Sequence, residues 1–200
     1  MGCDIHLHIE YRLKKERTIV IREAEYDNNG NEVRKAVTWT EKTDWRKYQF
    51  REEWSNRIYG MFAILADVRN RWDLNHIELR GFPDDAHSFT KEEYYLRVIT
   101  DDEFAKYGDN WHNCCSVSDA LRWGGKRFIM NNHEYTEHPD WHSANWCTTE
   151  EMKNAIDTIF KNEDGTYKGD YIQWLGLLGT MEGLERSGEY ECRAVYWFDN

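Results

Sequence analysis

Apolar and polar residues alternate strictly at the start of this chain, and strict alternation is typical of a strand with one buried face. The segment 3–13 has one apolar set and one polar set. The apolar set is Cys3, Ile5, Leu7, Ile9, Tyr11 and Leu13. The polar set is Asp4, His6, His8, Glu10 and Arg12. The pattern therefore predicts a strand over 2–13 with a chemically rich second face.

Further strand patterns occupy 17–26, 32–40 and 189–198, with a short one at 127–130. The Asn-Gly pair at 29–30 predicts a hairpin turn, so we expect the first three strands to form a meander. Helices are predicted near 58–69, 90–97, 116–123, 149–162 and 169–186. Thr90 and Thr100 each begin a capping-box pattern that is typical of a helix start. Residues 131–147 are predicted to be a polar loop. These elements predict one α+β domain over residues 1–200, with a mixed or antiparallel sheet that includes both terminal strands and is covered by helices on one face.

Composition narrows the class of protein. The 200 residues include 15% aromatic side chains, and a disordered chain is poor in these. The net charge is −11, and no cluster of Lys and Arg is present to bind duplex nucleic acid. No apolar run approaches the length of a membrane span, and residues 1–20 do not resemble a secretory signal. The sequence therefore predicts a soluble, cytoplasmic protein that binds neither membrane nor duplex.

The polar set of the first strand is the first candidate site. Side chains two positions apart on a strand lie roughly 7 Å apart, close enough to share a metal ion. Carboxylate and imidazole together suit zinc or manganese, so Asp4 and His6 are candidate ligands. Asp4, His6 and Asn132-His133-Glu134 are also similar, by analogy of chemistry, to pieces of metallophosphoesterases. The alternative is a solvated strand face on which His8 and Glu10 point into water.

A second group of candidate residues lies between 109 and 147. Asp109 and His112 are candidates to complete a metal or catalytic site, with the alternative of an ordinary polar surface loop. Trp111 and Trp141 are candidates to stack on a planar ligand, with core packing as the alternative. Asp67 follows a run that is apolar almost all round and is a further catalytic candidate. We expect Asp67 or Asp109 to lie within hydrogen-bonding reach of Asp4 or His6, because an unpaired buried carboxylate is costly.

Three sequence blocks carry a family resemblance. They are Met1-Gly-Cys-Asp-Ile-His6, the block Arg57-Ile-Tyr-Gly-Met-Phe-Ala-Ile-Leu-Ala-Asp-Val-Arg-Asn70, and Arg80-Gly-Phe-Pro-Asp-Asp85. Together with the closing Tyr-Trp-Phe-Asp-Asn, these resemble a functionally uncharacterised family of phage and prophage proteins. The family's Asp-Gly-His-Ser-x-Ser segment corresponds here to Asp109-Asn-Trp-His-Asn-Cys-Cys115, which departs from it after Asp109. The resemblance implies a protein made inside an infected bacterium and no particular activity.

Two functions follow as hypotheses. The first is a metal-dependent hydrolase of a phosphodiester or nucleotide-like small molecule, with Asp4, His6, Asp67 and Asp109 as catalytic residues. Asp4, His6 and His112 would bind the divalent ion, which would lower the pKa of a bound water. The second is a non-catalytic phage protein that sequesters a host nucleotide signal or inhibits a host protein. These patterns specify neither the ligand nor an oligomeric state.

Overall fold

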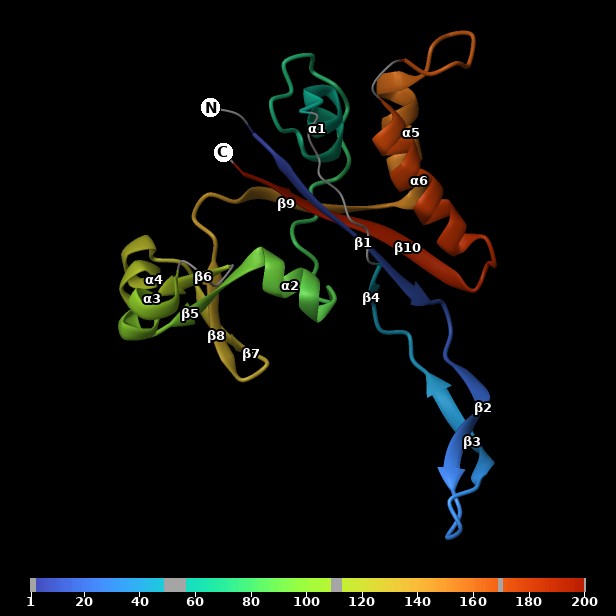
Figure 1. Cartoon of the computed structure of the whole chain (residues 1–200). Helices are drawn as coiled ribbons and strands as arrows, with labels where there is room; N and C mark the ends of the chain where they lie inside the picture. Colours follow the sequence, from blue (N-terminus) through green and yellow to red (C-terminus); the bar gives the residue numbers. More distant parts are fainter. Residues whose placement is uncertain (1–2, 49–56, 109–112, 169–170, 200) are drawn as a thin grey trace.

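The structure is a computed structural model that describes residues 3–48, 57–108, 113–168 and 171–199. Within these ranges it is an α+β fold, as predicted (Figure 1). The strands are β1 Ile5–Leu13, β2 Arg17–Tyr26, β3 Glu32–Glu41, β4 Arg46–Lys47, β5 Tyr95–Ile99, β6 Cys114–Ser116, β7 Arg127–Met130, β8 His133–Glu137, β9 His142–Thr148 and β10 Tyr190–Phe198. The helices are α1 Tyr59–Ala66, α2 Ser88–Tyr94, α3 Asp101–Tyr107, α4 Val117–Trp123, α5 Thr149–Phe160 and α6 Ile172–Glu185.

The central sheet has the strand order β4-β1-β10-β9, and its strand pairs are antiparallel. β1 and β10 pair along their whole length, from Ile5 opposite Phe198 to Leu13 opposite Tyr190. The two ends of the chain consequently lie side by side (Figure 1). The prediction of an antiparallel sheet that includes both terminal strands is confirmed.

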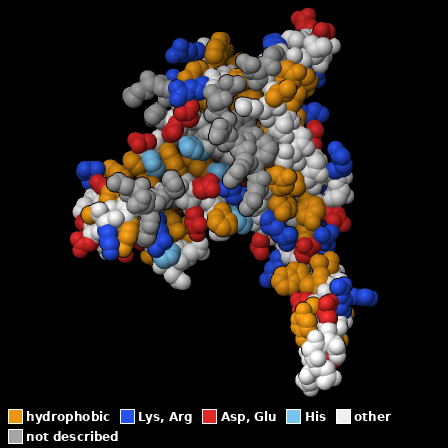
Figure 2. All heavy atoms as spheres, viewed as in Figure 1, with side chains coloured by type: hydrophobic (Ala, Val, Ile, Leu, Met, Phe, Trp, Pro, Cys, Tyr) orange, Lys and Arg blue, Asp and Glu red, His pale blue; other side chains and the backbone are white. Residues whose placement is uncertain are grey.

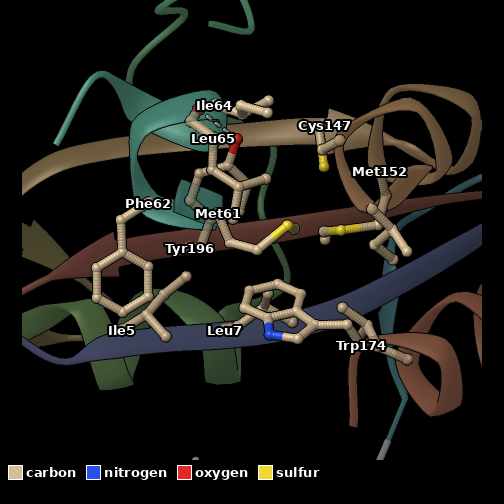
Figure 3. Close-up of a cluster of buried hydrophobic side chains, with 14 of the residues drawn as sticks. Ile5, Leu7, Met61, Phe62, Ile64, Leu65, Cys147, Met152, Trp174 and Tyr196 are labelled. Atoms are coloured by element: carbon tan, nitrogen blue, oxygen red, sulfur yellow. Dashed lines mark hydrogen bonds between the residues drawn. The ribbon is translucent and has the colours of Figure 1, made fainter. Parts of the chain in front are cut away.

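One face of this sheet is covered by α1, α5 and α6, as Figure 1 shows. The apolar set of β1 points into this core, where Met61, Phe62 and Leu65 of α1 are fully buried. Figure 3 shows these side chains with Trp174 of α6 and Tyr196 of β10, whose hydroxyl donates to the Leu65 carbonyl oxygen at 2.9 Å. The strand with one buried apolar face, predicted from the alternation along β1, is therefore confirmed.

A second sheet, of order β6-β5-β8-β7, packs with the short helices α2, α3 and α4. Local chemistry sets their ends: Thr100 and Glu103 form the predicted capping box of α3, and Ser116 caps α4. Two predictions fail here. The helix expected over 90–97 runs from Ser88 to Tyr94, is capped by His87, and gives way to strand β5. The loop expected over 131–147 contains strands β8 and β9, because pairing with β5, β7 and β10 overrides its polar composition.

β2 and β3 form a hairpin that projects away from the rest of the molecule, and we call it the arm (Figure 1). The hairpin itself is confirmed, with Arg17 opposite Glu41 and Tyr26 opposite Glu32. The predicted three-stranded meander is wrong, because β1 pairs with β10 and β4 and not with β2. Of the five predicted helices, the three that correspond to α1, α5 and α6 cover one face of the central sheet, whereas α2 and α4 pack with the second sheet. Over the described ranges, no helix is long and apolar enough to cross a membrane.

Candidate functional site

The second face of the central sheet carries the predicted site residues and is also covered by protein. Alternation along β1 and β10 brings polar side chains to this face, and the segment 80–95 lies against them. We call this surface the polar face. Facing pairs across the two strands are His6 with Trp197, His8 with Val195, Glu10 with Arg193, and Arg12 with Glu191.

A buried ion pair lies at the centre of the polar face. Arg193 donates from Nε and Nη2 to Glu10 Oε2 at 2.9 and 2.8 Å, and both side chains are buried. The other Glu10 oxygen accepts the His87 backbone N–H at 2.8 Å. Arg193 also donates to Asp85 at 2.8 Å and lies 3.9 Å over the Trp45 ring. The expectation that Glu10 could face water is wrong, because this network takes it out of solvent.

His8 is the next side chain along β1, and it contacts a carboxylate on α2. His8 Nε2 lies 3.0 Å from Glu93 Oε2, and Lys47 Nζ lies 2.7 Å from Oε1 of the same group. Burial lowers the pKa of His8, although the bond to Glu93 opposes this. Burial also tends to raise the pKa of Glu93, but the bonds from His8 and Lys47 outweigh it and hold that pKa at about 2. The lowered pKa favours the neutral form of His8, and Lys47 places a positive charge beside the Glu93 carboxylate.

His6 lies in an aromatic cluster at the edge of the polar face. Its ring stacks on Trp197 with centroids 5.5 Å apart and approaches Trp141 at 5.4 Å. His138 stacks on Trp141 at 4.3 Å with an interplanar angle of 7°. Figure 2 shows histidine side chains beside acidic ones on the viewed face. Trp141, predicted to stack on a ligand, already stacks on protein rings, so a ligand would have to displace His138.

Asp4 and His6 are linked through the last residues of the chain. The Asp4 backbone N–H donates to Asp199 Oδ1 at 2.9 Å, and His6 Nε2 lies 3.3 Å from Asp199 Oδ2. Both Asp4 oxygens accept from Arg57, at 2.6 and 2.8 Å, and these bonds lower the Asp4 pKa. Asp199 is a functional candidate that local sequence patterns missed, because its partner lies 193 positions away.

Asp67 is placed by the end of α1. It ends the helix in a left-handed conformation with φ 57°, and its carboxylate accepts from Asn70 at 2.8 Å. In the part of the chain that the structure describes, no hydrogen bond or ion pair joins Asp67 to Asp4 or His6. Asp109, Trp111 and His112 lie outside the described residues, so their roles remain predictions.

A divalent ion at Asp4 and His6 does not fit this arrangement as it stands. Arg57 occupies both Asp4 oxygens, and the His6 Nε2 faces Asp199. Among the residues in described positions, no three His, Cys, Asp or Glu side chains gather as a metal cluster. Metal ions in proteins are usually held by three or four protein donors. A metal site here would need Arg57 to leave and further ligands to arrive.

A cleft between α2 and β7 is the feature that the sequence analysis missed. It has a volume of about 410 Å³ and combines two lysines, two carboxylates and two aromatic rings. These six residues are Lys91, Lys126, Asp84, Glu137, Tyr95 and Phe128. Over the described ranges neither lysine is in an ion pair, and the two rings meet edge to face at 4.7 Å. Burial raises the Tyr95 pKa to about 12, so its hydroxyl stays protonated.

Two glycines position Lys126 at this cleft. Gly124 ends α4 with φ 69°, a conformation that favours glycine. A Cβ on Gly125 would lie 2.6 Å from Thr136 Oγ1, so only glycine allows the chain to pass this close to β8. The sequence signal that could have indicated the cleft is the run Gly124-Gly125-Lys126-Arg127-Phe128, where a basic pair and an aromatic follow a forced turn.

The cysteines are poor nucleophiles in this arrangement. Cys3, Cys115, Cys147 and Cys192 are buried, and burial raises the pKa of each thiol, to about 11 for Cys115. A thiol is reactive only as its thiolate.

Comparisons with protein-family models, with curated proteins and with solved structures give no match.

Proposed function

We propose that this protein binds a nucleotide-like small molecule in the cleft between α2 and β7 and holds it without cleaving it. The observation that supports this most is the pair of lysines without carboxylate partners in the described structure, set beside Tyr95 and Phe128. Ligand sites are typically concave, about 300–1,000 Å³, and lined by aromatic groups with a few polar ones. The cleft lies within this volume range and includes two aromatic residues, and four of its nine lining residues are charged.

Each part of a nucleotide has a complementary group in the cleft. An aromatic ring face stacks on a base, a contact worth about 1–3 kcal/mol. Lys91 and Lys126 are positive groups for a phosphate, and Asp84 and Glu137 are acceptors for ribose hydroxyls. The net charge of −11 opposes a long polyanion, whereas a small ligand interacts mainly with its local lysines. This fits the second of the two functions predicted from the sequence.

The setting belongs to the same proposal. A cytoplasmic protein made by a phage would meet host nucleotides, and holding one intact would remove a signal. This part is supported by the family resemblance of Met1–His6 and the block 57–70. It is independent of the cleft, so a binding result bears on the cleft whichever cell makes the protein.

The test is equilibrium binding followed by recovery of the ligand. Nucleoside 5′-monophosphates, cyclic mononucleotides and cyclic dinucleotides are titrated by calorimetry, and the protein is then denatured and the ligand analysed by chromatography. We expect one class to bind and to be recovered intact. Lys91→Ala and Lys126→Ala should each weaken binding about tenfold, the loss of one charged contact.

The matched control is Lys153→Ala, an exposed lysine on α5 that does not line the cleft. It should bind like the unchanged protein. If no nucleotide of the panel binds, or if both cleft variants bind as well as Lys153→Ala does, the proposal fails.

Hydrolysis is a second candidate function, and one observation favours it. His6 and Asp199 form a half-exposed His–carboxylate pair, with side-chain exposures of 39% and 33%. A carboxylate that orients a histidine is a common arrangement for a general base. Recovery of cleaved ligand, abolished by His6→Gln, would support this function over sequestration. A stoichiometric ion on protein purified without a His-tag, with turnover lost in chelator, would support the metal-dependent form.

A further inference from the structure

The arm leaves strand edges unpaired. β2 and β3 form a two-stranded sheet, and within the described residues they pair only with each other. An isolated hairpin is marginally stable in water, and a free edge offers backbone donors and acceptors to a further strand. The arm also exposes large apolar side chains, among them Val20 at 69% and Trp39 at 57% (Figure 2). The arm therefore has the character of a pairing surface.

The side chains on one face of the arm follow a self-complementary order. The odd-numbered residues of both strands share this face, because register pairs odd with odd. The facing pairs are Arg17 with Glu41, Ile19 with Trp39, Ile21 with Val37, and Glu23 with Lys35. Each strand therefore reads charge, apolar, apolar, opposite charge. Such an order matches a second copy of itself when the two strands run antiparallel.

We infer that two copies of this chain associate through their arms, with β3 pairing antiparallel to the partner's β3 about a two-fold axis at Thr38. The Asp27 N–H donates to the Asn31 carbonyl oxygen across the hairpin. Because backbone groups alternate in an antiparallel ladder, odd-numbered residues bond within the arm and Thr38 directs its backbone groups outward. The free groups of Thr38 then meet those of the partner's Thr38.

In this register apolar residues face apolar residues, and charged residues face residues of opposite charge, across four strands. Val37 faces the partner's Trp39, which places Ile19, Trp39 and two apolar partner residues in one continuous row. Lys35 faces the partner's Glu41, so the next row alternates in charge from Glu23 outward. Apolar and opposite-charge cross-strand pairs both stabilise a sheet, whereas like charges destabilise it.

The β2 edge has the same pattern but is obstructed at its base. Pairing about Val20 would place the partner's Tyr26 beside Lys14. The Lys14 backbone N–H is already used, donating to the Glu189 carbonyl oxygen at 2.9 Å. Arg17 at the base of β2 also bonds Glu189 and Tyr190. The β3 edge is therefore the one that accepts a second copy.

The first test is the mass of the full chain in solution, by light scattering after size exclusion at micromolar concentration. We expect twice 24.1 kDa. Val37→Glu sets a carboxylate in the apolar row and should give a monomer. The matched control is Val20→Glu, which faces Thr38 across the arm but lies on the outer strand, and it should remain a dimer. A monomeric unchanged protein overturns the inference, and so does a Val20→Glu variant that dissociates equally.

The second test reads the register directly. Thr38→Cys places two thiols at the two-fold axis, at the Cα separation of about 5.5 Å that both facing strand residues and disulfides adopt. A mild thiol oxidant should convert most of this variant to a covalent dimer. Val20→Cys and the unchanged chain, whose cysteines are buried or half-buried, should stay uncrosslinked. Crosslinking of Val20→Cys in place of Thr38→Cys would overturn the proposed edge.

Discussion

The two faces of the central sheet are both covered, yet different forces hold them. The face under α1, α5 and α6 is apolar, and its packing depends on shape and volume. The polar face is held by named partners, of which Glu10 with Arg193 is the most buried. Apolar contacts are individually replaceable, whereas a buried charge depends on one counter-charge. The same two strands therefore have one face that tolerates repacking and one that does not tolerate loss of a partner.

The strongest test of this comparison separates the ion pair into its halves. Arg193→Met leaves Glu10 charged and buried, and we expect a loss of about 3–5 kcal/mol of unfolding free energy. Glu10→Gln should cost less, because Arg193 keeps Asp85 and the new side chain still accepts from His87. The double variant should recover much of the Arg193→Met loss, since no buried charge is left unpaired. Urea unfolding of the four proteins measures this as a coupling energy. Strictly additive losses would show that packing, not charge, holds the polar face.

The apolar face should respond to volume. Leu65→Ala removes a fully buried side chain of α1 and is expected to cost about 2–5 kcal/mol, the range for a buried leucine. Leu121→Ala on α4 is the matched control, because Leu121 is 62% exposed, and it should change stability by no more than about 0.5 kcal/mol. Unlike Arg193→Met, the Leu65 loss should not be recovered by any single charge change on the other face. Equal effects of the two leucine changes would contradict the assignment of the core.

The sequence predicted the elements of this fold better than their partners. Alternation located β1, the arm and β10, because these patterns are local. It did not show that β1 pairs with β10, since the residues of that pair lie more than 170 positions apart. The polar string 131–147 contains strands that its polar composition did not indicate: β9 pairs with the distant β10, and β8 pairs with the neighbouring β7 and with β5.

For the candidate site too, the sequence predicted local positions but not their distant partners. Alternation placed His6 and His8 correctly on the face opposite the core. It read that face as a choice between a metal site and a solvated surface. What fills the polar face is a set of distant groups, Arg193, Glu93 and Asp199, that no local spacing indicates. Asp67 was predicted to be a site residue because it follows an apolar helix. In the structure it ends that helix in a left-handed conformation and accepts a hydrogen bond from Asn70.

The smallest expected effect is the dependence of the polar face on pH. His8 has a lowered pKa in the fold, so below its unfolded value of 6.5 the unfolded chain binds the proton more readily and stability falls. Glu93 is also lowered, from 4.5 to about 2, so its contribution is present above pH 4.5 and is lost as pH falls toward 2. Burial also lowers the pKa of His138, so His138 adds to the loss of stability below pH 6.5.

Replacing His8 separates the loss of stability below pH 6.5 from the loss between pH 4.5 and pH 2. Gln can still donate to Glu93 but does not titrate, so His8→Gln should reduce the fall in melting temperature between pH 6.5 and pH 5. The later fall, as pH decreases from 4.5 toward 2, should remain, because Lys47 still pairs with Glu93. Calorimetric melting across this pH range measures both, with His76→Gln, an exposed histidine, as the matched control. A variant whose melting temperature falls as steeply as that of the control between pH 6.5 and pH 5 would show that His8 titrates normally, and that the polar face is wetter than its packing indicates.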